Sequence, residues 1–412
     1  MPRGKKAKRA SRRPTGGDRI GALPDGVLHH VLSFLPAQQA VRTCLLARRW
    51  RHLWKSATGL RIGEHNINLR SVKENQGFLD HLLLLRDSAP LDTCVLMFRE
   101  GNKNMEDEDV ARMNLWFRHA LLRKARFLQL HVLYGKNDRW LVPIDDLPLV
   151  SRHLTRLHLY GIRLNDSFLN FSSCPALEHL VFRLCAFECA KISSNSVKLL
   201  SITNCTFSET LRVRIDTPSL VSLRLDDLSD RTPVLERMPS LVDAFVRIVD
   251  YTNDVCSDSD TGDCDREGCV PCYGIKDNNS VLLQGLSEAK TMVLINEHDS
   301  FIFERDLKWC PTFTKLKTLS LNEYWCERDD FHMLACILEH SPILEKLIFQ
   351  FDYQGQKSKI KGVFNQMERS AGILEHLQMV EVQCVMVDDT VVKVLNYLST
   401  FKIYFSFEEM EH

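Results

Sequence analysis

The sequence predicts an α/β chain in which a small module of three helices precedes an irregular repeat solenoid, with a parallel concave sheet and helices on its convex side. Two observations carry this prediction. Apolar residues recur at helical spacing near the N-terminus, and an L-x-x-L-x-L pattern recurs along most of the remaining chain. With 412 residues, of which 44% are hydrophobic, the chain is long enough to bury a sizeable core.

The charged residues are unevenly distributed along the chain. It has 53 basic and 53 acidic side chains, but residues 1–13 contain seven bases and no acid, whereas residues 250–277 contain eight acids and two bases. The rest of the chain is close to neutral. We therefore expect partner recognition to rest on apolar anchors, with the two charged segments as accessories.

Composition also excludes a membrane protein. Charges interrupt every apolar stretch before the roughly 18 residues that a spanning helix requires, and no apolar segment follows the basic N-terminus to form a secretory signal. We expect the protein in the nucleus, the cytoplasm or both. The 14 cysteines are then expected to be reduced thiols.

Residues 1–17 form a basic tail of mostly small and charged residues. We predict that the tail is disordered, because it buries too little apolar surface to offset the entropy of ordering. One interpretation is a nuclear-localisation signal or a weak nucleic-acid contact. A solvated tail without such a role is an equal alternative.

Residues 18–62 have the pattern of three short helices. Pro24 suits the first turn of the first helix, and Pro36 ends that helix. The apolar stripes of the three helices comprise, in order, Leu28, Val31, Leu32 and Leu35; Ala40, Val41, Cys44 and Leu45; and Trp50, Leu53 and Trp54. Because so small a module has little core of its own, we expect a partner or the following domain to cover part of its apolar surface.

This segment resembles the F-box of plant proteins. The resemblance rests on Leu23-Pro24-Asp25, Leu28, residues 31–36, residues 40–44 and residues 48–54, and it covers the whole module in order and spacing. An F-box docks a substrate receptor onto a Skp-type adaptor and, through it, onto a cullin-RING ubiquitin ligase. The structural alternative is a three-helix cap that serves packing alone.

The resemblance also implies roles for individual residues. The residues expected to contact the adaptor are Leu23, Pro24, Leu28, Val31, Leu32, Leu35, Pro36, Val41, Leu45 and Leu46. Trp50, Leu53 and Trp54 are expected to divide between the core of the F-box and its join to the next domain. Gly26 stands where a better helix former is usual, which weakens the first helix slightly.

Downstream, the L-x-x-L-x-L pattern is typical of leucine-rich repeats. The repeats are Leu91-Cys94-Leu96, Ala125-Leu128-Leu130, Leu154-Leu157-Leu159, Leu177-Leu180-Phe182, Val197-Leu200-Ile202, Leu220-Leu223-Leu225, Leu241-Ala244-Val246, Ala289-Met292-Leu294, Leu316-Leu319-Leu321, Leu344-Leu347-Phe349 and Leu374-Leu377-Met379. Each unit is expected to supply one strand, and stacked units to form an extended binding surface. Cys185 and Cys205 occupy the Asn/Cys position of the pattern and are predicted to be buried thiols.

The repeat array is expected to cover residues 63–372. Helical spacing near residues 80–85, 116–122, 280–286 and 331–339 predicts helices on its convex side. Residues 373–412 are expected to supply the last repeat and a cap made of a helix at 391–398 and a strand at 402–407. This end is similar to the FBD-type C-terminal region of plant F-box/leucine-rich-repeat proteins.

Residues 250–277 form an acidic insertion that contains Cys256, Cys264, Cys269 and Cys272. Only Cys269 and Cys272 have the tight spacing of zinc ligands. The insertion is therefore either a zinc site or, as the stronger alternative, an exposed acidic loop with incidental cysteines. It is also a candidate for contact with the basic tail or with a basic substrate.

No catalytic motif occurs in the sequence. It lacks a phosphate-binding loop, a dinucleotide-binding G-x-G-x-x-G after a strand, a G-x-S-x-G elbow and an H-E-x-x-H pair. We therefore assign no catalytic residue, metal or cofactor. The resemblance implies a non-catalytic substrate-recognition subunit of an SCF-type (Skp–cullin–F-box) ubiquitin ligase, whose repeats bind an unidentified protein target.

Two other functions stay open at this point. The first is a leucine-rich-repeat scaffold that binds a nuclear protein outside any ligase. The second, less favoured, is a nucleic-acid-binding protein led by the basic tail, since the rest of the chain is near neutral and has no groove-reading motif. The sequence does not reveal whether a small molecule assists target binding.

Overall fold

The computed structural model describes most of the chain. The described residues are 20, 23–64, 69–101, 105–134, 141–208, 212–249, 254, 280–296, 302–326, 331–351, 358–364, 376–384, 387, 389–400 and 403–408. The basic tail and the four cysteines of the acidic insertion lie outside them, so disorder, a nuclear signal and zinc binding stay predictions there. Within the described ranges, no helix is long and apolar enough to cross a membrane.

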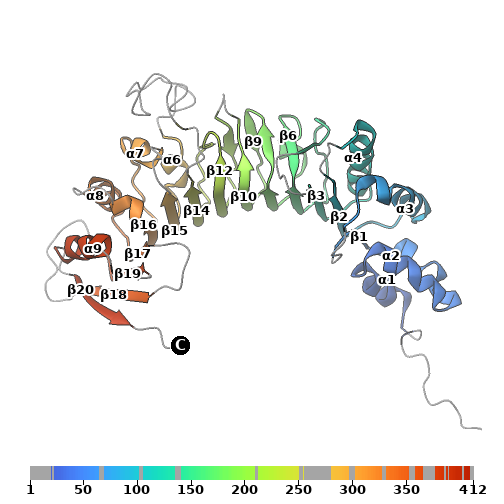
Figure 1. Cartoon of the computed structure of the whole chain (residues 1–412), viewed down its shortest axis with the longest axis horizontal. Coiled ribbons are helices and arrows are strands. Elements are labelled where there is room, and N and C mark those ends of the chain that lie inside the picture. The colour runs from blue at the N-terminus through green and yellow to red at the C-terminus, as the bar shows by residue number, and fades with distance from the viewer. Residues whose placement is uncertain are drawn as a thin grey trace, which may run out of the picture.

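One long sheet runs through most of the chain, and its strands lie on the inner side of an arch (Figure 1). Each strand pairs in parallel with the next. From the N-terminal end they are β1 (Gly59–Ile62), β2 (Thr93–Arg99), β3 (Phe127–Leu133), β5 (Arg156–Tyr160), β7 (His179–Arg183), β10 (Leu199–Thr206), β12 (Ser222–Ser229), β14 (Asp243–Ile248), β15 (Thr291–Asn296), β16 (Thr318–Asn322), β17 (Lys346–Gln350) and β19 (Met379–Cys384). A shorter parallel ladder joins β4 (Val142–Pro143), β6 (Ile162–Asn165) and β8 (Ala186–Glu188).

The leucine-rich pattern becomes continuous rows of buried side chains. Leu157, Leu180 and Leu200 oppose one another on neighbouring strands, and each is fully buried. Every predicted repeat except the last pairs in the predicted register. Cys185 and Cys205 are buried free thiols, as predicted. Residues between the buried positions face the open side of the sheet, because side chains alternate along a strand.

The predicted register of the last repeat is wrong. The pattern Leu374-Leu377-Met379 places Met379 inward, but β19 pairs with β17 so that Val380 opposes Leu347. Met379 is 36% exposed, whereas Val380 is fully buried. Two overlapping apolar patterns fit this segment, and only pairing with the neighbouring strand selects between them.

The structure adds a repeat at the N-terminal end of the array. Residues 59–62, which the sequence analysis included in the F-box range, form β1 and pair with β2. Gly59 fits there because a side chain would clash with the carbonyl oxygen of Ser33, at the end of helix α1 (Asp25–Ser33). The helical module is therefore packed directly against the first strand of the sheet.

Helices cover the outer side of the arch towards both ends, and short strands cover its middle (Figure 1). The described helices of the array are α3 (Val72–Leu85), α4 (Asp107–Leu122), α6 (Leu283–Leu286), α7 (Ile302–Leu307), α8 (His332–Glu339) and α9 (Asp389–Ser399). All four predicted helical connections are confirmed, as α3, α4, α6 and α8. In the middle, β9 (Lys191–Ser193), β11 (Arg214–Asp216) and β13 (Val234–Leu235) form a second parallel sheet.

Repeat length explains where strands replace helices. Leu180, Leu200 and Leu223 oppose one another on β7, β10 and β12 and follow closely along the chain, so each connection has room for a short strand only. Leu60 and Cys94 occupy the same position of the first two repeats, but a much longer segment separates them and accommodates α3. Among the described residues, the middle of the array accordingly has no covering α-helix, although a short 3-10 helix, η4 (Phe171–Ser173), lies there.

The C-terminal end of the array departs from simple stacking. The predicted helix and strand are confirmed as α9 and β20 (Ile403–Glu408). Between β19 and β20 lies β18 (Ser358–Phe364), antiparallel to both. Tyr397 of α9 stacks on Phe331 with 4.3 Å between ring centroids, which fixes α9 against the preceding repeat.

Two buried carboxylates stabilise the array beside the acidic insertion. Asp306 of α7 is fully buried and accepts hydrogen bonds from three backbone N–H groups at the start of α6. Asp254 is 3% exposed, and its Oδ1 lies 2.5 Å from Nη1 of Arg212. This ion pair connects residue 254 of the insertion to the array. Because the pair is buried, removal of either partner would leave an unpaired buried charge, which is strongly unfavourable.

Candidate partner-binding surfaces

The N-terminal module consists of two α-helices followed by 3-10 turns: α1, α2 (Ala37–Arg42), η1 (Thr43–Leu45), η2 (Arg48–Arg51) and η3 (Leu53–Ser56). The expectation of a continuous third helix is therefore corrected. The break lies at His52, whose φ of −121° is not helical. Trp50, Leu53 and Trp54 are nevertheless buried, Trp50 on η2 and the other two on η3.

Hydrogen bonds fasten this module to the first repeats. Arg86, which follows α3, donates to the carbonyl oxygens of Trp54 and Ala57. Arg61 of β1 donates through Nε to the carbonyl oxygen of Ser33 at 3.0 Å. These contacts satisfy carbonyl groups at the ends of α1 and η3, and they connect the helical module directly to the first repeats.

The ten residues expected to contact an adaptor divide by exposure. Leu28 and Leu32 are 0% and 1% exposed and belong to the core of the module. The half-buried residues are Leu35, Pro36 and Val41, and the exposed ones are Leu23, Pro24, Val31, Leu45 and Leu46. The two buried leucines therefore support the surface from beneath.

Two exposed apolar residues were missed by sequence reasoning. Val27 is 44% exposed and Phe34 is 58% exposed. Together with Val31 they occupy positions i, i+4 and i+7, which lie on one side of α1. That spacing is a second apolar stripe beside the one that the sequence analysis used. We define the F-box apolar surface as Leu23, Val27, Val31, Phe34, Leu45 and Leu46.

Arg49 connects η2 to the start of α1 beside this surface. Its Nε and Nη2 donate to Oδ1 of Asp25 at 3.1 and 2.6 Å, and Nη2 also donates to the carbonyl oxygen of Leu23 at 2.6 Å. The pair is exposed, so its contribution to stability is small. Its effect is to fix Leu23 relative to η2.

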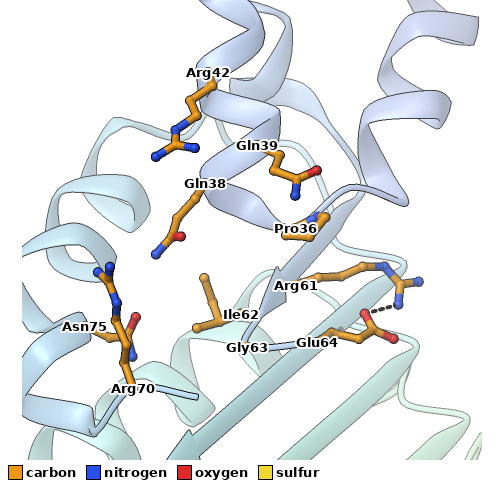
Figure 2. A pocket seen from close by; sticks show the side chains of 10 residues that line it. All are labelled: Pro36, Gln38, Gln39, Arg42, Arg61, Ile62, Gly63, Glu64, Arg70 and Asn75. Carbon is orange, nitrogen blue, oxygen red and sulfur yellow. Dashed lines mark hydrogen bonds and ion pairs between the residues drawn. The ribbon is translucent and has the colours of Figure 1, made fainter. Parts of the chain in front are cut away.

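A polar cleft of about 230 Å³ lies where the helical module meets the first repeat (Figure 2). Its lining residues are Pro36, Gln38, Gln39, Arg42, Arg61, Ile62, Gly63, Glu64, Arg70 and Asn75. Nη1 of Arg61 and Oε2 of Glu64 form an ion pair of 2.6 Å in its wall. Of the predicted adaptor residues the lining includes Pro36 alone, so the cleft is separate from the F-box apolar surface.

A second surface lies on the open side of the sheet, across β3, β5 and β7. Its members, which we call the basic-aromatic face, are Phe127, Gln129, His131, Arg156, His158, Tyr160, His179, Val181 and Arg183. They alternate with buried residues, and each is half-buried or exposed. None of them is acidic, although bases and acids are equal in number over the whole chain. The sheet therefore has a local excess of positive charge here.

Guanidinium groups and aromatic rings lie against one another on this face. The guanidinium carbon of Arg156 is 5.2 Å from the ring centroid of Phe127, and that of Arg183 is 6.0 Å from the ring centroid of Tyr160. Such cation–π contacts restrain a guanidinium without neutralising its charge. Both arginines are therefore held on the surface as positively charged groups.

Two histidines of this face, His131 and His158, resist protonation. Burial lowers the pKa of His131 to about 4, and the nearby His158 and Arg183 act in the same direction. Burial also lowers the pKa of His158, helped by Arg156 and His179. Both shifts arise chiefly from burial, and the neighbouring basic groups add to them, so a further proton is disfavoured at these two positions.

The neighbouring strands differ in their charge balance. On β12, Asp226 accepts from Nη2 of Arg224 at 2.5 Å and from Nε of Arg247 on β14 at 2.6 Å. This carboxylate offsets one of the two guanidinium charges. The β3–β7 segment differs, because no member of the basic-aromatic face is a carboxylate.

Comparison with known proteins agrees with this arrangement. The F-box domain matches residues 20–59. The chain is 30% identical over 357 residues to the meiotic F-box protein MOF of Oryza sativa subsp. japonica, covering 80% of this chain and 70% of that protein. An F-box/LRR-repeat protein of Arabidopsis thaliana is 29% identical over 373 residues, covering 81% of this chain and 92% of the relative.

A further relative in Arabidopsis thaliana is described as an F-box/FBD/LRR-repeat protein. It is 27% identical over 366 residues, which cover 81% of this chain and 78% of the relative. The similarity thus spans the helical module and most of the sheet, in agreement with the order of elements described above. The chain belongs to the plant F-box/leucine-rich-repeat proteins.

Proposed function

We propose that this protein is the substrate-recognition subunit of an SCF-type ubiquitin ligase. The proposal rests on the order of two features along the chain. An F-box with an exposed apolar surface is followed by a curved sheet with an open face. One surface would bind a Skp-type adaptor and the other a protein target. The chain would contribute proximity and orientation, while ubiquitin transfer is carried out by other subunits.

The apolar character of the first surface supports adaptor binding. Leu45 is 83% exposed and Leu46 is 70% exposed, which is unfavourable in a free protein. Burial of an exposed Leu or Val side chain contributes about 1.5–3 kcal/mol, so a partner that covers several of these residues gains a large part of its binding energy there. Arg48 and Arg49 would lie at the polar rim of such an interface.

The basic-aromatic face supports binding of a target segment rich in acidic residues. Arg156 and Arg183 lie on neighbouring strands, and no member of this face is a carboxylate that would compensate them. An extended acidic segment could place carboxylates against both guanidinium groups while its apolar atoms pack on Phe127 and Tyr160. This refines the expectation from composition, which favoured apolar anchors alone.

A pull-down with a purified Skp-type adaptor tests the first part. The double variant Val31→Asp plus Leu46→Asp should bind roughly 100-fold more weakly than wild type while retaining its circular dichroism spectrum, because each exposed anchor contributes about 2 kcal/mol or less. Leu122→Asp is the matched control, since Leu122 is 79% exposed on α4, outside the F-box. Wild-type protein that fails to bind, or a folded double variant that binds normally, would contradict the proposal.

Affinity purification with the proteasome blocked tests the second part. Wild-type protein and the Val31→Asp plus Leu46→Asp variant should enrich the same target, but only wild type should raise its ubiquitination. A target whose ubiquitination is the same in both samples would favour the alternative, a scaffold that binds a nuclear protein outside any ligase. We also propose that the protein acts in the nucleus, the cytoplasm or both, which imaging with and without residues 1–17 tests.

A further inference from the structure

Two thiols and an imidazole come together on the helical side of the array. Cys336 and His340 lie one turn apart at the C-terminal end of α8, and Cys310 follows α7. One ligand atom of each residue lies within 4.8 Å of those of the other two. Sγ of Cys336 is 4.0 Å from Nδ1 of His340. The three side chains are only partly buried, so solvent and ions have access to them.

We propose that Cys310, Cys336 and His340 form a zinc site, with a water or an external ligand in the fourth position. Two thiolates and one imidazole are a donor set that Zn²⁺ prefers. Around a tetrahedral Zn²⁺ with Zn–S bonds of about 2.3 Å, ligand atoms are roughly 3.5–3.8 Å apart. The present separations exceed this by about 1 Å or less, which small side-chain rotations close. Binding would convert each thiol to a thiolate and release one proton from each.

Stacking of the repeats creates this site. The stretch of chain between Cys310 and Cys336 is similar in length to that between Leu319 and Leu347, which oppose each other in consecutive repeats. Residues one repeat apart lie side by side in such a stack. A metal here would therefore link the connection after α7 to α8 and tie two neighbouring repeats together.

One existing hydrogen bond already orients the imidazole. Nδ1 of His340 is 2.8 Å from the carbonyl oxygen of Cys336, which holds the ring beside the thiols. Because Nδ1–H donates to this carbonyl, Nε2 is the nitrogen whose lone pair is free for the ion, and the backbone contact orients the ring as in known sites. Sγ of Cys336 lies 3.9 Å from the carbonyl oxygen of Leu307, a contact that the thiol would give up on becoming a thiolate.

Cobalt spectroscopy on the full chain tests the site. The background carries Cys256→Ser, Cys264→Ser, Cys269→Ser and Cys272→Ser, so that the acidic insertion supplies no thiolate. One equivalent of Co²⁺ should produce a sulfur-to-cobalt charge-transfer band that Zn²⁺ removes, and Zn²⁺ should raise the thermal midpoint relative to chelator. Adding Cys336→Ser or His340→Ala should weaken metal binding roughly 100-fold, whereas Cys44→Ser, a half-buried cysteine of the F-box, should not.

Two results would overturn the proposal. The first is a background protein that shows no charge-transfer band and no shift of the thermal midpoint with metal. The second is a Cys310–Cys336 disulfide that forms under mild oxidation while the reduced protein binds no metal, because the cluster would then be a redox pair. Neither result depends on adaptor binding, so the test is independent of the proposed ligase function.

Discussion

The F-box apolar surface and the basic-aromatic face, as proposed partner-binding surfaces, would bind by different physical means. The first exposes aliphatic and aromatic side chains such as Val31 and Leu45, and the second exposes guanidinium, imidazole and ring groups such as Arg183. Apolar burial responds weakly to salt, whereas attraction between charges is screened by it. Substitutions and salt can therefore disable each surface separately.

Buried leucines lie beneath both surfaces, and we call them the supports of each surface. Leu28 and Leu32 lie beneath the apolar surface, and Leu157 and Leu180 lie beneath the basic-aromatic face; all four are almost completely buried. A substitution in a support therefore affects folding, and a substitution on the surface affects binding.

The largest effect is expected from loss of a support. Leu28→Ala should lower the free energy of unfolding of the F-box by about 2–5 kcal/mol, because it leaves a cavity at a fully buried site. Leu45→Ala, a matched truncation at an exposed site, should change it by about 0.5 kcal/mol or less. Urea unfolding followed by tryptophan fluorescence measures both. Equal effects of the two variants would contradict the assigned surface.

The next largest effect is expected on the binding of an acidic ligand when positive charge is removed from the basic-aromatic face. Arg156→Glu plus Arg183→Glu should weaken binding of poly-glutamate by roughly 30-fold, which corresponds to about 2 kcal/mol, because two attractive contacts become repulsive. Adaptor binding should be unchanged. Lys124→Glu plus Arg152→Glu is the control, since both residues lie on connections outside the face. Fluorescence anisotropy measures the affinities, and equal losses in both double variants would argue against a local site.

Salt should weaken binding at the two surfaces to different extents, and the difference should be smaller than the effect of the arginine substitutions. A tenfold rise in ionic strength should weaken poly-glutamate binding by about tenfold and adaptor binding by less than about twofold, because screening acts mainly on exposed charges. The same anisotropy and pull-down assays measure this at several salt concentrations. If salt weakened adaptor binding as much as poly-glutamate binding, the two surfaces would not differ in the way that we propose.

The smallest effect concerns pH. The pKa of His131 is lowered from about 6.5 to about 4 in the folded protein, chiefly by burial. The unfolded chain therefore binds more protons, so stability present above pH 6.5 is lost as pH falls towards 4. Allowing for partial solvent exposure, the loss is on the order of 1 kcal/mol. His131→Gln should flatten the pH dependence of urea unfolding, and a variant with the same pH dependence as wild type would contradict this prediction.

Much of the fold was predictable from the sequence. The apolar positions of ten repeats, four of the helices on the convex side, and the C-terminal helix and strand follow from periodicity, because burial in a stacked array requires an apolar residue at each inward position. Helix α7 was not predicted. The register of the last repeat did not follow, since Leu377 and Val380 both continue an apolar pattern. The antiparallel β18 gave no pattern that distinguishes it from a connection.

The binding surfaces were predictable only in part. A resemblance to the F-box identified the right module, but it did not separate buried Leu28 from exposed Val31, because both lie on apolar stripes of one short helix. Val27 and Phe34 were missed although their spacing was visible. The basic-aromatic face was missed because its residues belong to three separate repeats and become neighbours only through strand pairing.

The sequence by itself therefore determined the order of modules, the inward residues of most repeats and the family. These depend on local periodicity and on motifs that the linear order of residues preserves. Tertiary structure alone decided which apolar residues stay exposed, how Arg156 and Arg183 form one surface, and how Cys310, Cys336 and His340 meet. The physical reason is that stacking converts a separation of one repeat into a distance of a few ångströms, which no local pattern records.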